Sequence, residues 1–516
     1  MAQHFTQTVG TFGGTKPIKW LPSAVPQSLQ QPGALFIPGP SLRDDAWLRR
    51  ASGPQHAYSI VGVTHTTASK GAMDELSGLL TAPVQPWDAV ICTSHAVRAM
   101  VRDLLDSSAD YLRSRFGLGR DVPVAEPQLP VIPLGVECDL FAQDTAARAR
   151  LRNSLGAGPA DIIVLFVGRL SFHAKAHPMV MYRALQRVVR DLPIGARLHL
   201  VEAGWFANDS IAAAYRQQAA LLAPDVIHHV LDGRLPDIRQ GIWQAADIFC
   251  SLADNIQETY GLTPVEAMAA GLPSVVTDWD GYKDTVRDGI DGFRVPTWMP
   301  PSPLGEDIAF AHAADEINYD LYCGLSSQFV VVDEDATAQA ISRLATDADL
   351  RQRMGAAARE RARTVFDWRV VIRQYQQLLT ELAAIRIDSA GRGVELASPA
   401  AGQPRWPQRT DPFRSFGGYP SYRMGGDMLV ERLPAVMPGV VQTLLNNPMI
   451  AFASRALPPV EGLETLLDRL PPVGQRVPAV EVLNSLPPSS QAIGLRTLAW
   501  FAKHGLVRLT APRGSI

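Results

Sequence analysis

Short apolar segments that alternate with helix-like segments run through the first third of the chain. The apolar segments lie at 34–39 (ALFIPG), 58–65 (YSIVGVTH), 87–94 (WDAVICTS) and 129–137 (LPVIPLGVE), with helices expected over 43–50 and from residue 95 onward. Strands and helices that alternate at this spacing are typical of a parallel sheet covered by helices. The pattern predicts an α/β domain over 34–158, after an irregular segment rich in Gln, Pro and Gly over 1–33.

The same alternation resumes at residue 159 and continues to residue 385. Strands are expected at 161–170 (DIIVLFVGRL), 197–204, 226–231 and 247–251, and from 274 onward, with helices at about 178–190, at 210–222 and up to residue 246. Residues 336–385 predict two more helices, because apolar residues recur there at i, i+3 and i+4. A second α/β domain over 159–385 follows from this pattern.

The last part of the chain has a different composition. Residues 386–428 are rich in Gly, Pro and Arg and predict a linker, and residues 429–516 predict a small module of short helices. Its last helix ends near His504 and precedes the strand-like LVRLT, an order similar to the recognition helix and wing of a winged-helix domain. That helix carries only Arg496 and Lys503, whereas a helix that reads DNA is basic. We therefore expect a module for protein contact or self-association, and no nucleic-acid partner.

Composition places the chain among ordinary globular proteins of about three domains. It has 516 residues, of which 47% are hydrophobic and 19% charged, and a net charge of −3. The four cysteines are far apart and predict reduced thiols rather than disulfides or a zinc site. No apolar segment approaches the ~20 residues that span a bilayer, and the first residues do not resemble a signal peptide. A cytoplasmic location is expected.

Residues 251–276 (SLADNIQETYGLTPVEAMAAGLPSVV) carry the chemistry that is most specific. Glu258 falls in the loop that leaves a buried strand, and Glu266 falls in the first turn of a helix expected over Pro264–Ala270. Ligands of open α/β sheets bind at the carboxyl ends of the strands, and a helix N-terminus attracts phosphate. Two acids beside an anion site suit a ligand with both hydroxyls and phosphate, such as a sugar nucleotide.

Two cations precede this segment. Arg169 ends the strand at 161–170, and Lys175 follows six residues later. When a nucleotide diphosphate departs from a sugar it gains negative charge, which fixed cations at strand ends stabilise. His173 and His177 lack a nearby carboxylate and do not predict a metal site. The Asp-Trp-Asp triplet at 278–280 is better explained as a cap or turn than as a metal ligand.

Together these segments resemble a known family. E-x7-E within NIQETYGLTPVEAMAAGLPSVV, and VGRL with its following lysine, are similar to retaining GT-B glycosyltransferases of group 1 (family 4). VTHTTAS, WDAVICTSHAVRAMV and VIPLGVECDLF are similar to the N-terminal domain of that family. The resemblance implies two Rossmann-like domains that face a cleft, with the acceptor domain at 34–158 and the donor domain at 159–385. It also implies that the last helix of the donor domain crosses back onto the acceptor domain.

The resemblance also implies roles for single residues. Arg169 and Lys175 would bind the diphosphate, Glu258 the transferred sugar and Glu266 the ribose hydroxyls. Gly261, Leu262 and Thr259 are further candidates for substrate binding. His65 would contact the sugar, and the alternative is a histidine in a turn. Gly14 would belong to a phosphate-binding loop, and the alternative is a simple turn.

The expected function is retaining transfer of a hexose from a nucleotide-diphosphate sugar to an acceptor hydroxyl, without a metal or other cofactor. A same-face substitution is expected, because no residue stands out as a covalent nucleophile. The alternatives are a non-catalytic sugar-nucleotide sensor that signals through 429–516, and a GT-B sugar-nucleotide epimerase. The acceptor is left open, and a lipid acceptor would imply peripheral membrane contact. The acceptor domain has few strands, so its first βα unit either lies upstream of this chain or is reshaped.

Overall fold

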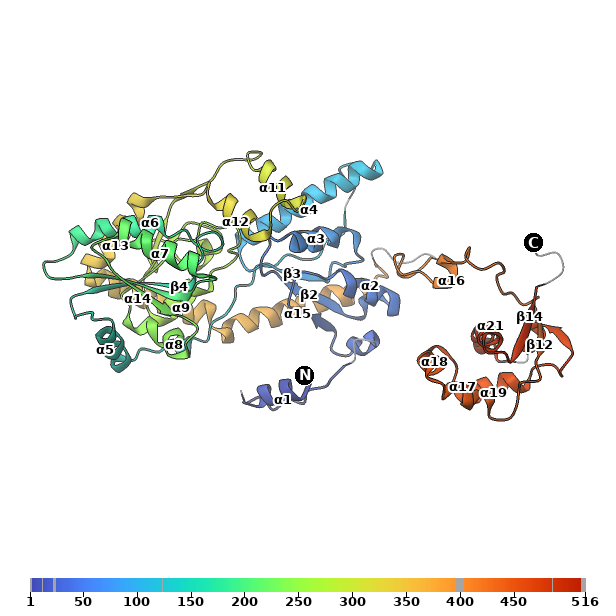
Figure 1. Ribbon diagram of the computed structural model, residues 1–516. Helices are drawn as coiled ribbons and strands as arrows, with labels where there is room; N and C mark the ends of the chain where they lie inside the picture. The colour runs from blue at the N-terminus through green and yellow to red at the C-terminus, as the bar shows by residue number, and fades with distance from the viewer. Residues whose placement is uncertain are drawn as a thin grey trace. The chain divides into compact units, whose positions relative to one another are not determined.

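The computed structural model describes residues 2–11, 13–21, 25–122, 124–395, 403–484 and 486–511. It divides into two compact units, Met1–Trp406 and Pro407–Ile516. The first unit contains the two α/β domains that were predicted, each with a parallel sheet (Figure 1). No helix within the described ranges is long and apolar enough to cross a membrane.

The N-terminal domain is built on a small parallel sheet. Its three strands lie in the order β1 (Ala34–Phe36), β2 (Ser59–Val63), β3 (Ala89–Ile91), and its helices are α2 (Arg43–Ser52), α3 (Lys70–Gly78) and α4 (His95–Phe116). The fourth strand predicted at 129–137 is wrong, since this segment makes only isolated bridges, from Val131 to Cys92 and from Val136 to Asp367. Pro130 and Pro133 lack the N–H groups that a continuous ladder requires.

The donor domain contains one fully parallel six-stranded sheet. The strands lie in the order β6 (Ile227–Asp232), β5 (Leu198–Trp205), β4 (Ile162–Arg169), β7 (Ile248–Ser251), β8 (Ser274–Thr277), β9 (Gly292–Val295). Relative to the chain this is the order 3-2-1-4-5-6 of dinucleotide-binding domains, whose order reverses between β4 and β7. Ile163, Val164 and Leu165 of β4 are fully buried, because helices cover both faces of the sheet.

Helices form a separate core on each face of this sheet. One core contains side chains of α6 (Met179–Val188), α7 (Asp209–Leu222) and α13 (Glu334–Thr346). The other contains side chains of α8 (Pro236–Ala245) and α9 (Leu262–Ala270), and α5 (Thr145–Ser154) packs against α8.

The two helices predicted over 336–385 are in fact three. Asp347 ends α13, and its side chain accepts a hydrogen bond from Leu350 N at the start of α14 (Ala348–Arg361). The third, α15 (Trp368–Gly391), crosses to the N-terminal domain as the family resemblance implies (Figure 1). Its residues Leu378 and Leu382 pack with Val61 and Ile91 of β2 and β3. The expected linker at 386–428 therefore begins inside a helix.

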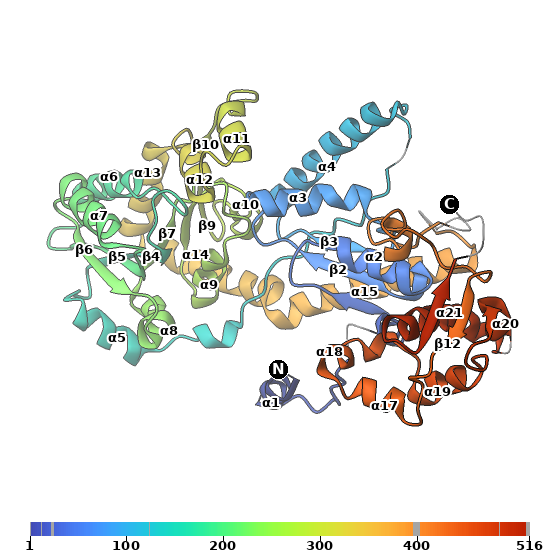
Figure 2. The ribbon, with the colours of Figure 1, turned by 45° about the vertical axis from the view of Figure 1, so that its right-hand side comes forward.

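A long excursion separates β9 from α13. Strands β10 (Thr297–Trp298) and β11 (Val331–Val332) pair at its base, and between them lie α11 (Glu306–Ala313) and α12 (Tyr319–Ser327). The end of α11 lies near the start of α3, where Lys70 Nζ donates to Ala313 O at 3.1 Å (Figure 2). We refer to residues 296–332 as the insertion.

The second unit combines helices with a three-stranded antiparallel sheet. Strand β12 (Leu429–Arg432) lies between β13 (Arg476–Pro478) and β14 (Val507–Thr510). The helices are α16 (Pro412–Ser415), α17 (Val440–Leu445), α18 (Pro448–Ala451), α19 (Val460–Asp468), α20 (Ala479–Asn484) and α21 (Pro488–Lys503). Val430, Leu463 and Phe501 belong to its core. The order of a last helix followed directly by a strand is as predicted.

Candidate active site

The loops that follow β4 and β7 meet at the carboxyl edge of the donor-domain sheet. These two strands are neighbours, so Lys175 after β4 and Glu258 after β7 come together although 83 residues separate them. Both line a cavity of about 210 Å³, to which Gly261, Leu262 and Thr263 also contribute. The cavity lies where the strand order reverses, which is the usual ligand position in such sheets.

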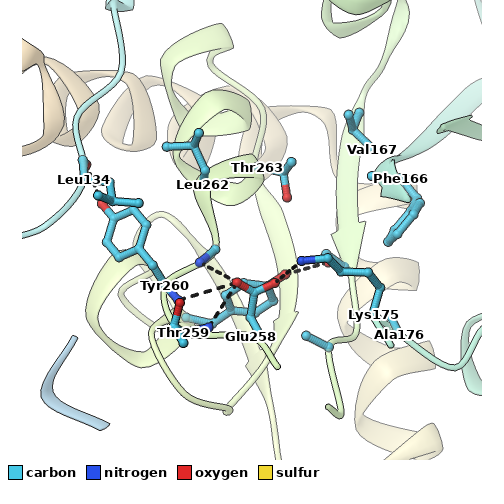
Figure 3. A pocket seen from close by; sticks show the side chains of 15 residues that line it. Leu134, Phe166, Val167, Lys175, Ala176, Glu258, Thr259, Tyr260, Leu262 and Thr263 are labelled. Carbon is cyan, nitrogen blue, oxygen red and sulfur yellow. Dashed lines mark hydrogen bonds and ion pairs between the residues drawn. The ribbon is translucent and has the colours of Figure 1, made fainter. Parts of the chain in front are cut away.

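The Glu258 carboxylate is held in place by the backbone and by Lys175. Its Oε1 accepts hydrogen bonds from the N–H groups of Gly261 at 3.0 Å and Thr259 at 3.3 Å. Its Oε2 lies 3.5 Å from Lys175 Nζ (Figure 3). The Glu258 side chain is 15% exposed and that of Lys175 is 32% exposed, so both reach solvent through the cavity. The site thus offers an anion and a cation to the same ligand.

Helix α9 points its N-terminus at this cavity. It begins at Leu262, two residues before the predicted start at Pro264, because Gly261 takes a left-handed conformation with φ of 84° and turns the chain into the helix. A Cβ at Gly261 would lie 2.0 Å from Cε1 of Tyr282. The first N–H groups of a helix lack partners within it and carry partial positive charge. The position therefore suits a phosphate.

The earlier helix start moves Glu266 from the predicted first turn into the second turn of α9. Glu266 is half-buried and does not line the cavity. Burial raises the pKa of its carboxyl to about 7, and the charge of Arg239 opposes this shift. The carboxyl is thus poised between its neutral and charged forms near neutral pH.

Arg169 makes a hydrogen bond to the loop that carries Glu258. Its Nη2 donates to Gln257 Oε1 at 3.3 Å, and Gln257 N donates to Asn255 Oδ1 at 2.8 Å. Asn255 is fully buried, and its Nδ2 also donates to His173 O at 2.8 Å. It therefore joins the loop of Lys175 to the loop of Glu258. Sequence reasoning missed Asn255, although an asparagine three residues before Glu258, in a loop that leaves a buried strand, was a visible signal.

Four of the predicted residues do not line the cavity: Arg169 and Glu266, described above, and also His65 and Gly14. His65 follows β2, is exposed, and lies with its Nε2 3.1 Å from Pro38 O. Gly14 follows helix α1 (Ala2–Thr11), where its N–H donates to Val9 O. Among the described residues 2–11 and 13, which form helix α1 and a turn, no strand leads into Gly14 as it would in the phosphate loop that the resemblance suggested. In this structure both residues make the turn contacts given as their alternatives.

The Asp-Trp-Asp triplet forms a turn before α10 (Tyr282–Thr285). Asp280 takes a positive φ of 42°, and its Oδ1 accepts a hydrogen bond from Ser94 Oγ of the N-terminal domain at 3.2 Å. Burial, reinforced by the charge of Glu258, raises the pKa of Asp280 to about 7. Within the described ranges no three His, Cys, Asp or Glu side chains are grouped to hold a metal ion.

The N-terminal domain contacts the donor loops through the end of β3 and the start of α4. His95 N donates to Asp284 Oδ2 at 2.7 Å, and His95 Nδ1 lies 3.1 Å from Asp284 Oδ1. Thr93 Oγ1 donates to Thr259 O at 3.4 Å, directly beside Glu258. The cavity is therefore next to the boundary between the two α/β domains.

Residues 161–313, which include both cations, both glutamates and the start of α9, match the model of the family described as glycosyl transferases group 1. This segment is therefore similar to the group 1 glycosyltransferases. The chain is 31% identical over 182 residues to the D-inositol 3-phosphate glycosyltransferase of Nocardia farcinica, which covers 35% of this chain and 38% of that protein. It is 29% identical over 268 residues to the phosphatidyl-myo-inositol mannosyltransferase of Mycobacterium tuberculosis, which covers 52% of this chain and 56% of that protein.

The chain thus spans well under two thirds of the length of these relatives. Among solved structures, the Anabaena protein Alr3699/HepE in complex with UDP is 17% identical, with a TM-score of 0.45 over 70% of this chain and 81% of that chain.

Proposed function

We propose that this protein is a retaining glycosyltransferase that transfers a hexose from a nucleotide-diphosphate sugar to an acceptor hydroxyl. The observation that carries the proposal is the Lys175–Glu258 pair, 3.5 Å apart at the N-terminus of α9, inside the group 1 segment. A cation and a helix N-terminus suit the diphosphate, and a carboxylate suits the hydroxyls of the sugar.

In the proposed reaction the diphosphate lies between Lys175, Arg169 and the first N–H groups of α9. As the bond from the anomeric carbon to the phosphate oxygen breaks, negative charge grows on that oxygen and these groups stabilise it. The acceptor hydroxyl attacks from the same face, and its proton passes to the departing phosphate oxygen. Glu258 orients the sugar through its hydroxyls, and Glu266 accepts hydrogen bonds from the ribose. Charge stabilisation of this kind is worth on the order of 10²-fold in rate per group.

The first test is a thermal-shift screen with UDP-, GDP- and ADP-sugars, because a bound donor stabilises the folded chain and needs no acceptor. The sugar nucleotide that gives the largest shift is then used to measure hydrolysis and transfer. We expect Arg169→Met and Lys175→Gln to lose about 10²-fold in turnover. Arg150→Met is the matched control, because Arg150 is exposed on α5.

Three outcomes would contradict the proposal. If none of the sugar nucleotides stabilises the chain, the prediction of a donor site is wrong. If wild type and Lys175→Gln have equal turnover, Lys175 does not stabilise the departing diphosphate. Donor binding without turnover, with any acceptor offered, would favour the sensor over the enzyme.

A further inference from the structure

The insertion (296–332) contacts both loops that carry the candidate donor-binding residues. Asn255 Nδ2 donates to Cys323 O of α12 at 3.4 Å, as well as to His173 O. Gly324 packs so closely against the other loop that an added Cβ would lie 3.0 Å from His173 Cβ. Because His173 precedes Lys175 by two residues, α12 bears on the segment that carries this cation.

The N-terminal end of the same helix reaches the N-terminal domain. The Tyr319 hydroxyl lies 3.0 Å from Thr66 Oγ1, in the loop between β2 and α3. A second pair joins Lys70 Nζ to Asp315 Oδ1 at 2.8 Å. The insertion therefore spans from the donor loops to the loop that leaves β2, whose residue His65 was a candidate for contact with the sugar.

The two bridging pairs differ in the geometry that they can impose. Lys70 and Asp315 are 45% and 78% exposed, and an exposed ion pair of two mobile side chains contributes little. The Tyr319–Thr66 pair is partly buried and joins a rigid ring to a short side chain. Burial raises the pKa of Tyr319 to about 12, so the hydroxyl keeps its proton at neutral pH. The tyrosine is thus the stronger geometric constraint.

We propose that Tyr319 is a positioning residue for sugar transfer, which acts by holding the loop after β2 at a fixed place relative to the diphosphate-binding loops through its bond to Thr66. This inference rests on the proposed function. A nucleotide alone binds to the donor domain, so losing the bond should leave nucleotide affinity unchanged. Transfer needs both domains in register, so kcat should fall.

The experiment compares Tyr319→Phe, Thr66→Val and the double variant with wild type. We expect each single variant to lose about fivefold to tenfold in kcat, the cost of one part-buried hydrogen bond, with the dissociation constant of the nucleoside diphosphate within twofold of wild type. Tyr319→Phe also removes the contact of the hydroxyl with the Cys323 thiol. The double variant should therefore lose no more than Tyr319→Phe alone, because both remove the bond to Thr66.

Tyr322→Phe is the matched control. Tyr322 lies on the same helix and is also half-buried, but its ring stacks on His312 with centroids 4.2 Å apart, inside the insertion. This variant should keep the kcat of wild type. A kcat for Tyr319→Phe that equals the kcat for Tyr322→Phe would overturn the proposal, as would effects of Tyr319→Phe and Thr66→Val that multiply in the double variant.

A second measurement separates this proposal from the proposed function. Amide hydrogen exchange at residues 64–69 should be faster in Tyr319→Phe and Thr66→Val than in wild type, and unchanged in Tyr322→Phe. This holds whether or not the wild type transfers sugar. Unchanged exchange in all three variants would refute the bridge, whereas an inactive wild type with the expected exchange pattern would refute only the enzyme.

Discussion

Among single residues, Glu266 couples the proposed donor site to pH. Burial raises the pKa of its carboxyl to about 7. In the proposed function the ribose hydroxyls donate to the ionised form of Glu266, so binding below pH 7 would first have to remove a proton. We expect the dissociation constant of the sugar nucleotide to rise by up to tenfold for each pH unit below 7, and to be constant above it.

Isothermal titration at pH 6 and pH 8, in buffers of different ionisation enthalpy, measures this linkage. About one proton should be released at pH 6 and almost none at pH 8. Glu266→Gln distinguishes this group from Asp280, whose pKa is also raised to about 7, and should abolish the linkage. Equal affinity and no proton release at both pH values would contradict the prediction.

The residues that the sequence places best are those set by local chain geometry. Lys175 and Glu258 each follow a recognisable strand, and adjacent parallel strands bring their ends together. The sequence could have marked Asn255 by its place before Glu258, but the partners of Asn255 and Tyr319 lie in distant segments, for which a single sequence gives no spacing rule. Gly14 was placed by family resemblance alone, and His65 by the resemblance together with its position at a strand end; neither lines the cavity.

At the scale of the elements, the buried strands of the donor domain were predictable from the sequence. The proline-containing segment 129–137 and the start of α9 were not. The apolar residues 161–170 became β4, whereas the equally apolar 129–137 did not form a strand because its prolines remove ladder donors. The start of α9 was misplaced because Pro264 is a common first helical residue. The left-handed Gly261 in fact begins the helix two residues earlier.

Asn255 joins three elements, and its loss should disturb all of them. Its Nδ2 faces the carbonyl oxygens of His173 and Cys323. Asn255→Asp replaces this donor with a carboxylate oxygen, so two buried acceptors would face a buried negative charge. We expect a loss of about 2–3 kcal/mol in the free energy of unfolding, measured by urea denaturation, and weaker binding of the sugar nucleotide.

The matched control for this substitution is Asn153→Asp, because Asn153 is exposed on α5. It should change the free energy of unfolding by less than about 0.5 kcal/mol. If both variants unfold at the same urea concentration as wild type, Asn255 does not hold the two loops together.

For the whole molecule, composition and alternation sufficed to predict two α/β domains and a separate terminal module. Composition and alternation did not predict where the linker begins and ends, because a Gly-, Pro- and Arg-rich segment can still pack against a neighbour. Glu395 Oε1 lies 2.8 Å from His56 Nδ1, and the ring of Trp406 stacks on Trp47 with centroids 6.3 Å apart. Trp406 is the last residue of the first compact unit.

This packing predicts where the chain can be divided. The two units have separate hydrophobic cores in the described residues, so a chain ending at Trp406 should unfold cooperatively and keep the full stabilisation by the sugar nucleotide. A chain ending at Gly391 loses the contacts of Glu395 and Trp406 with α2 and its neighbours, including the bonds from Arg50 to the Pro404 and Arg405 carbonyls. These contacts are worth about 2–3 kcal/mol, so its midpoint should be about 2–4 °C lower in differential scanning calorimetry. Equal midpoints for the two shortened chains would mean that residues 392–406 are a linker after all.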